Sequence, residues 1–198
     1  MPVRQSAQRG FSAIELLVVL AVAGTLAAMS VPMSMSMVDD FRLSGDAHDV
    51  SNSVALAKMS AAAQFTRARL YADLTANTYR VEVWRKTGAP GWVADGGTAL
   101  LAPGDAFGAG TIAAPPPDSQ LAVAQAPACR NNAGAAIANS ACVLFNSRGI
   151  SVDEAGAPSG VRLFYLTGPT AVFAVVVSGT SQLKVWRISP GGGTWKQQ

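Results

Sequence analysis

The sequence predicts an α+β fold in which one long N-terminal helix packs on antiparallel β-sheets. After a basic segment of ten residues comes an apolar, helix-forming stretch, and helical spacing of apolar residues continues beyond residue 38. The β-forming stretches all follow in the remaining C-terminal part. No helical stretch returns between them, which excludes the βαβ alternation of a parallel sheet.

The N-terminal segment has the length and polarity of a membrane helix. A basic leader, residues 1–10, ends at Gly10 and is followed by Phe11 and by one acid, Glu15. The next 23 residues, Leu16 to Val38, contain no charge, and about 20 helical residues suffice to cross a bilayer. Residues 11–38 are therefore predicted to form a transmembrane segment, and a costly carboxylate within it indicates a function.

The segment GFSAIELLVVLAVAGTLAAMSVP resembles the class III signal of type IV pilins and type II secretion pseudopilins. In that family a prepilin peptidase cuts after the glycine and methylates the new N-terminal residue. The resemblance implies cleavage after Gly10, N-methylation of Phe11 and removal of residues 1–10 as a prepilin leader. It also implies that Glu15 pairs with the free amine of Phe11 on an adjacent subunit during fibre assembly.

A proline occupies a position typical of this family. Pro32 lies where many pilins have a proline that kinks the helix. Because proline removes a backbone donor and clashes with the preceding turn, we expect a kink or local break near residues 29–32.

A plain signal anchor is the alternative for this segment, since it also combines a basic N-terminus with an apolar helix. The adjacent Gly10 and Phe11 and the spacing of Glu15 favour the pilin signal. An ordinary secretory signal is cut after its apolar region, at a small-x-small site. Here the cut precedes the apolar run, so that run stays in the mature protein.

The charged residues predict on which side of the membrane the N-terminus lies, and they give no reason to expect a nucleic-acid partner. The formal net charge is +3, but loss of the two leader arginines leaves 13 bases against 12 acids, which gives no argument for nucleic acid. The basic leader favours a cytoplasmic N-terminus in the bacterial inner membrane. Residues 39–198, about 160 residues, are then predicted to form one periplasmic domain, which later enters the pilus or pseudopilus fibre.

Disulfides persist in that compartment, and the chain has two cysteines. Cys129 and Cys142 enclose 12 residues, and a bridge of this size contributes about 3 kcal/mol. A redox pair or a metal site is the alternative, but there is no C-x-x-C spacing and no second ligand pair. A structural disulfide is therefore the preferred interpretation.

The first element of the domain is predicted to continue the helix to about residue 73. Its apolar residues recur at steps of three and four, so they trace one face that is expected to lie against a sheet. They are Ala47, Val50, Val54, Ala57, Ala61, Phe65, Ala68 and Ala72. The single histidine, His48, has no clustered ligands around it and predicts no metal site.

The rest of the chain reads as β-strands separated by loops rich in Gly, Ala and Pro. Alternation of apolar and polar residues, β-branched composition and flanking turn residues predict the strands. They are residues 78–86, 91–94, 100–102, 121–126, 143–145, 161–167, 171–177 and 182–189. The glycine-rich tail at residues 190–193 is expected to be flexible, with Trp195 as an anchor.

The C-terminal half resembles the GspH/FimT branch of minor pilins and pseudopilins. In that branch a Phe-x-x-x-Gly turn precedes the final strands, and it is matched here by Phe145 and Gly149. Some members bind DNA through a Gly-Arg-x-Arg motif in the last turn. This chain has Ser-Gln-Leu-Lys at residues 181–184, so Lys184 is the one base retained there. Lys184 and Arg187 are the residues expected to contact DNA if this chain does so.

Two functions follow from the sequence. The first is a structural subunit, a minor pilin or pseudopilin that is incorporated in, or primes, a type IV pilus or type II secretion pseudopilus. The resemblance implies that its partners are the prepilin peptidase, other pilin or pseudopilin subunits and the inner membrane. The alternative is a pilus-associated subunit that contacts DNA in natural transformation. No catalytic motif, metal-ligand cluster or cofactor motif is found, so an enzyme is not expected.

Overall fold

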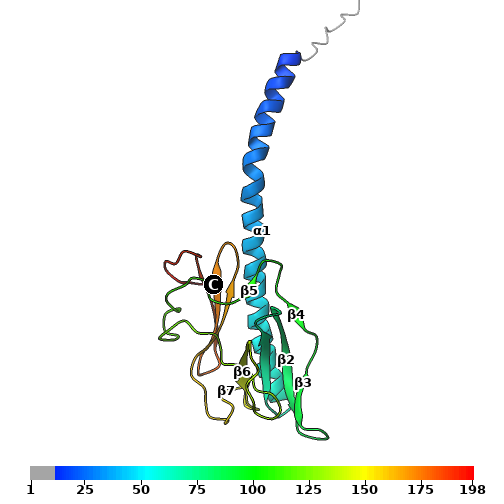
Figure 1. Cartoon of the computed structure of the whole chain (residues 1–198), viewed down its shortest axis with the longest axis vertical. Helices are drawn as coiled ribbons and strands as arrows, with labels where there is room; N and C mark the ends of the chain where they lie inside the picture. The colour runs from blue at the N-terminus through cyan, green and yellow to red at the C-terminus, as the bar shows by residue number, and fades with distance from the viewer. Residues whose placement is uncertain (1–11) are drawn as a thin grey trace, which may run out of the picture. The chain divides into compact units, whose positions relative to one another are not determined.

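The computed structural model describes residues 12–198, except for the side chains of residues 29–34. The processing positions Gly10 and Phe11, and the side chain of Pro32, therefore lie outside the described residues. Helix α1, Ala13–Ala63, is followed by strands that form two antiparallel sheets (Figure 1). The chain is thus α+β, as the order of its elements predicts.

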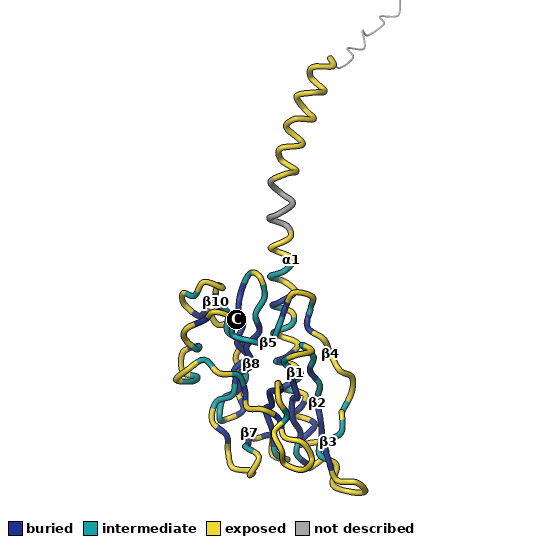
Figure 2. Tube along the Cα trace, viewed as in Figure 1, coloured by how far each residue is buried: buried dark blue, intermediate teal, exposed yellow. Residues whose placement is uncertain are grey.

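Helix α1 contributes to two compact units, residues 1–38 and residues 39–198. In the first unit, the side chains described from residue 12 onwards are exposed (Figure 2). In the second unit, one face of α1 is fully buried. The residues of that face are Leu43, Ala47, Val50, Val54, Ala57 and Ala61. Steps of three and four between them confirm the predicted amphipathic face up to residue 61.

The first sheet, sheet A, has strand order β3-β2-β1-β6-β7, and β4 pairs with β2. Its strands are β1 Ala68–Asp73, β2 Thr78–Arg85, β3 Gly91–Ala94, β4 Ala99–Leu100, β6 Ser140–Phe145 and β7 Ser151–Val152. The second sheet, sheet B, has order β11-β10-β9-β8-β5. Its strands are β5 Ala106–Phe107, β8 Arg162–Thr167, β9 Val172–Val177, β10 Leu183–Ile188 and β11 Lys196–Gln197.

The main core of the domain joins the buried face of α1 to one face of each sheet. Alternation in the central strands places large apolar side chains there, including Phe145 from sheet A and Phe164 and Phe173 from sheet B. The opposite face of sheet B carries a second cluster. Trp195 belongs to it and donates its Nε1 hydrogen to the carbonyl oxygen of Ala114 at 3.0 Å, which confirms the predicted anchor of the tail.

The predicted end of the helix is wrong by about ten residues. α1 ends at Ala63, because Phe65 adopts a left-handed conformation with φ of 49°. The amide of Thr66 then donates to the carbonyl of Ala61, and that of Phe65 to the carbonyl of Ala62, which is a Schellman arrangement. Residues 68–73 form β1 instead, since a spacing of four between apolar residues fits a strand as well as a helix.

The loop region between β3 and β6 also differs from the prediction. The strand expected at residues 100–102 is β4, Ala99–Leu100, and no strand forms at residues 121–126 among the described residues. Gln125 holds that segment on β8 instead, because its side-chain amide exchanges hydrogen bonds with the backbone of Tyr165 at 2.8 and 3.0 Å. Leu121 is fully exposed, whereas Val123 packs against the second cluster and Ala126 is buried in the main core.

Candidate functional site

Glu15 lies in the first turn of α1, and its side chain is exposed. A carboxylate at this end of a helix is favoured by the helix dipole, typically by about 0.3–1 kcal/mol. Its neighbours Ile14 and Leu16 are 71% and 58% exposed. The acid is therefore surrounded by uncovered apolar side chains, and burial of this surface would require a cation or a proton at Glu15.

The apolar part of α1 in the first unit has a broad exposed surface. The large side chains that are at least half exposed there are Ile14, Leu16, Leu17, Val18, Val19, Leu20, Val22, Leu26, Met35 and Met37. Monomeric soluble proteins rarely expose large apolar patches, so this surface is a candidate for contact with a partner or with lipid. Over the residues that the structure describes, no helix is both long and apolar enough to cross a membrane.

The part of α1 within the domain is joined to sheet B by Asp40. The Arg187 Nη2 atom donates to Oδ1 of Asp40 at 2.6 Å, and the Thr170 hydroxyl donates to the same oxygen at 3.3 Å. Both members of the ion pair are about one third exposed, so the pair contributes at most about 1 kcal/mol. Its main effect is to fix the position of the helix on β10.

A second carboxylate on the same part of α1 meets a buried acid. Oδ2 of Asp46 accepts a hydrogen bond from the amide of Ala102 at 2.7 Å. Asp105 lies beside Asp46 and is only 7% exposed. Burial, followed by the negative charge of Asp46 and a hydrogen bond between the two carboxyl groups, raises the pKa of Asp105 to about 7.

The two bases named for DNA contact are not brought together. Lys184 pairs with Val176 and Arg187 with Phe173, and these partners belong to the clusters on opposite faces of sheet B. Residues three apart in a strand necessarily point to opposite faces. Arg187 is also engaged by Asp40. This placement gives no support to a single DNA-contacting patch at Lys184 and Arg187.

Cys129 and Cys142 form the expected disulfide, with their Cα atoms 5.0 Å apart. The bridge packs against Tyr71 on the outer face of sheet A, that is, the face away from the main core. The enclosed segment, which we call the disulfide loop, is held to that face by two further hydrogen bonds. Arg69 donates to the carbonyl of Arg130 at 2.7 Å, and the amide of Trp92 donates to Oδ1 of Asn132 at 2.9 Å.

Beneath the disulfide loop lies a charged cluster that the sequence interpretation missed. Glu82 accepts from Arg69 through one carboxylate oxygen at 2.6 Å and from Arg80 through the other at 2.7 Å. Arg69 and Glu82 are almost fully buried, and burial lowers the pKa of Arg69 although Glu82 opposes the shift. Pairing makes such burial tolerable.

Aromatic rings continue this cluster on the same face. The guanidinium of Arg69 lies 4.0 Å from the ring centre of Trp92, and that of Arg67 lies 5.0 Å from Trp84. The sequence pattern that could have indicated this cluster is present in β2, where alternation places Arg80, Glu82 and Trp84 on one face. The sequence could not show that Trp92 of β3 and the disulfide loop lie on this face.

Among the described residues, no group of three or more His, Cys, Asp or Glu side chains is placed to hold a metal ion. Comparison of the chain with protein-family models, curated proteins and solved structures finds no match.

Proposed function

We propose that this protein is a minor pilin or pseudopilin, a structural subunit that is incorporated in, or primes, a type IV pilus or type II secretion pseudopilus. One observation carries the proposal. Gly10, Phe11 and Glu15 stand at the spacing of a prepilin signal, directly before the uncharged residues 16–38. The exposed apolar surface of α1 in the first unit supports the proposal, because fibre packing would cover it.

In this proposal, the peptidase frees the amine of Phe11, and the apolar helices of neighbouring subunits pack side by side. The Glu15 carboxylate of one subunit then meets the Phe11 amine of the next. Apolar helix surfaces slide past one another with little change in energy, so one buried ion pair selects a single register. A subunit out of register would leave Glu15 buried without a cation, which is strongly unfavourable.

The domain has the complementary role of positioning α1. Leu43 and Val50 are fully buried in the main core, and Asp40 holds the same helix on β10 through Arg187. These contacts fix the part of the helix that belongs to residues 39–198. The disulfide loop is likewise held covalently, which suits an extracytoplasmic location.

Substitution of Glu15 tests the proposal. We expect Glu15→Val to be processed and to remain in the membrane, but to be absent from fibres sheared off the cells. Glu15→Asp, which retains the charge on a shorter side chain, should be incorporated partially. Thr25→Val is the matched control, since Thr25 donates only to the carbonyl of Val22 within its own helix, at 2.8 Å. Incorporation of Glu15→Val at the wild-type level would contradict the proposed role of Glu15.

A further inference from the structure

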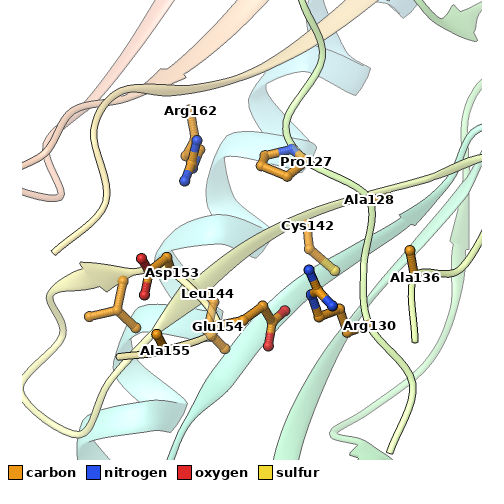
Figure 3. Close-up of a pocket in the computed structure, with 11 residues that line it drawn as sticks. Pro127, Ala128, Arg130, Ala136, Cys142, Leu144, Asp153, Glu154, Ala155 and Arg162 are labelled. Carbon is orange, nitrogen blue, oxygen red and sulfur yellow. The ribbon is translucent and has the colours of Figure 1, made fainter. Parts of the chain in front are cut away.

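Two adjoining hollows form one groove on the outer face of sheet A. The first has a volume of about 480 Å³ and the second about 400 Å³, and both are lined by Arg130, Glu154 and Ala155. Figure 3 shows Arg162 across the first hollow from Arg130 and Glu154. The second hollow extends towards Trp84 and Trp92. Together they make an elongated groove between the disulfide loop and the turn at residues 153–157.

The second hollow has an aromatic wall. The rings of Trp84 and Trp92 are 5.3 Å apart and nearly perpendicular, and both side chains are half-buried. Arg67 covers part of these rings, at 5.0 Å from Trp84 and 5.8 Å from Trp92. Neither indole nitrogen donates a hydrogen bond to another described residue. Arg69 also lies over the Trp92 ring, at 4.0 Å. The pair therefore offers an angled apolar surface, made by those parts of the two rings that the guanidinium groups leave uncovered, with two available donors.

Charges of both signs line the groove. They are Arg67, Arg130, Arg162, Asp153 and Glu154. None of these five groups forms an ion pair with another described residue, although Arg130 donates to the carbonyl of Gly134 at 2.7 Å. A groove of this kind presents charged donors and charged acceptors close together.

The aromatic wall and the charges of both signs together favour one class of ligand, a sugar. A sugar hydroxyl is both a donor and an acceptor, so it satisfies a guanidinium and a carboxylate in turn, while the apolar face of the ring stacks on an indole. A polyanion such as single-stranded nucleic acid would also stack, but its phosphates would meet Asp153 and Glu154 with repulsion. The mixed charges therefore favour an uncharged polyol over a nucleic acid.

The groove is held in shape before any ligand arrives. The Cys129–Cys142 bridge closes the disulfide loop, and Cys142 itself lines the first hollow. Hydrogen bonds from Arg69 and Trp92 fix that loop on the sheet. A wall that is already ordered lowers the entropic cost of binding.

We propose that this groove binds a short oligosaccharide, with a sugar ring packed in the angle between Trp84 and Trp92 and with Arg130 and Glu154 hydrogen-bonding to its hydroxyls. The inference is independent of fibre assembly, because every contributing residue lies within residues 39–198 of one chain. Its test uses the isolated full-length protein, so a negative result here leaves the proposed fibre role unaffected.

The test is titration of the full-length protein with cellotetraose and chitotetraose, followed by tryptophan fluorescence and calorimetry. A zwitterionic detergent is required, since the headgroups of glucoside detergents would compete for the groove. We expect saturable binding of at least one tetrasaccharide, and a loss of about tenfold in affinity for Trp92→Ala or Trp84→Ala. Trp186→Ala, which removes a half-buried tryptophan of sheet B, is the matched control and should bind as the wild type does.

A second variant separates sugar from nucleic acid. Glu154→Gln changes an exposed side chain and should leave the thermal midpoint unchanged. It should weaken the tetrasaccharide several-fold, whereas removal of a negative charge would strengthen binding of an oligothymidylate of about twelve nucleotides. Failure of both tetrasaccharides to bind at about 5 mM would overturn the inference. So would Trp-dependent binding of the oligothymidylate without binding of either sugar, which would make the groove a nucleic-acid site.

Discussion

Asp105 should make the stability of the domain depend on pH in an unusual direction. It is buried beside Asp46, whose own carboxylate is held by the amide of Ala102. The pKa of Asp105 is raised from 3.8 to about 7 by burial and by Asp46. The folded state therefore binds a proton more tightly than the unfolded state does, which is the reverse of a carboxylate stabilised by an ion pair.

The sign and the size of the effect follow from this difference. The contribution to stability is fully present below about pH 4, declines as the pH rises through the interval between the two pKa values, and is lost above about pH 7. At 1.36 kcal/mol per pKa unit, the full loss is about 4 kcal/mol.

Asp105→Asn tests this directly, since an amide resembles the protonated acid and can donate to Asp46. Between pH 5 and pH 8, the free energy of unfolding of the variant should rise by about 2–3 kcal/mol relative to the wild type. Urea unfolding of the full-length protein in detergent, followed by tryptophan fluorescence, provides the measurement. Asp118→Asn, at an exposed loop position, is the control. The reasoning would be refuted if the difference in the free energy of unfolding between Asp105→Asn and the wild type were the same at pH 5 and at pH 8.

Three further changes have definite expected effects on the urea midpoint. Phe65→Gly should stabilise the domain by about 0.5–1 kcal/mol, because Phe65 is 77% exposed and glycine adopts its left-handed φ without strain. A loss of stability would contradict the assignment of the helix end. Glu82→Ala should lower the free energy of unfolding by about 3 kcal/mol or more, because Arg69 is left buried and unpaired. A loss below about 1 kcal/mol would show that the pair is not desolvated. Serine at both Cys129 and Cys142 should cost about 3 kcal/mol, and wild-type stability under non-reducing conditions would exclude the bridge.

Long periodic segments and the strongest strands could be predicted from the sequence. The buried face of α1 up to Ala61 follows from the spacing of its apolar residues, and β2 from alternation between Thr78 and Arg85. The end of α1 could not be predicted in this way. Ala68 and Ala72 are four residues apart, which fits both periods, and the left-handed turn at Phe65 has no glycine to mark it.

The polar sites could not be predicted, because they depend on contacts between segments that are distant in the sequence. Asp46 and Asp105 are 59 positions apart and meet only once the loop before β5 is folded onto α1. Trp84, Trp92 and Arg130 likewise come from two strands and the disulfide loop. The opposite orientations of Lys184 and Arg187 were available from the sequence, because three positions along a strand reverse the face. That deduction required only the strand assignment.

Mass spectrometry of fibres sheared from the producing cells tests the central claim most directly. A minor pilin or pseudopilin should yield a peptide that begins at Phe11 and carries one added methyl group on its amine, found in the fibre fraction together with a major subunit. That subunit would also distinguish a pilus from a secretion pseudopilus. Protein that stays in the membrane with residues 1–10 still attached would contradict the account, and a plain signal anchor would then explain the N-terminal segment.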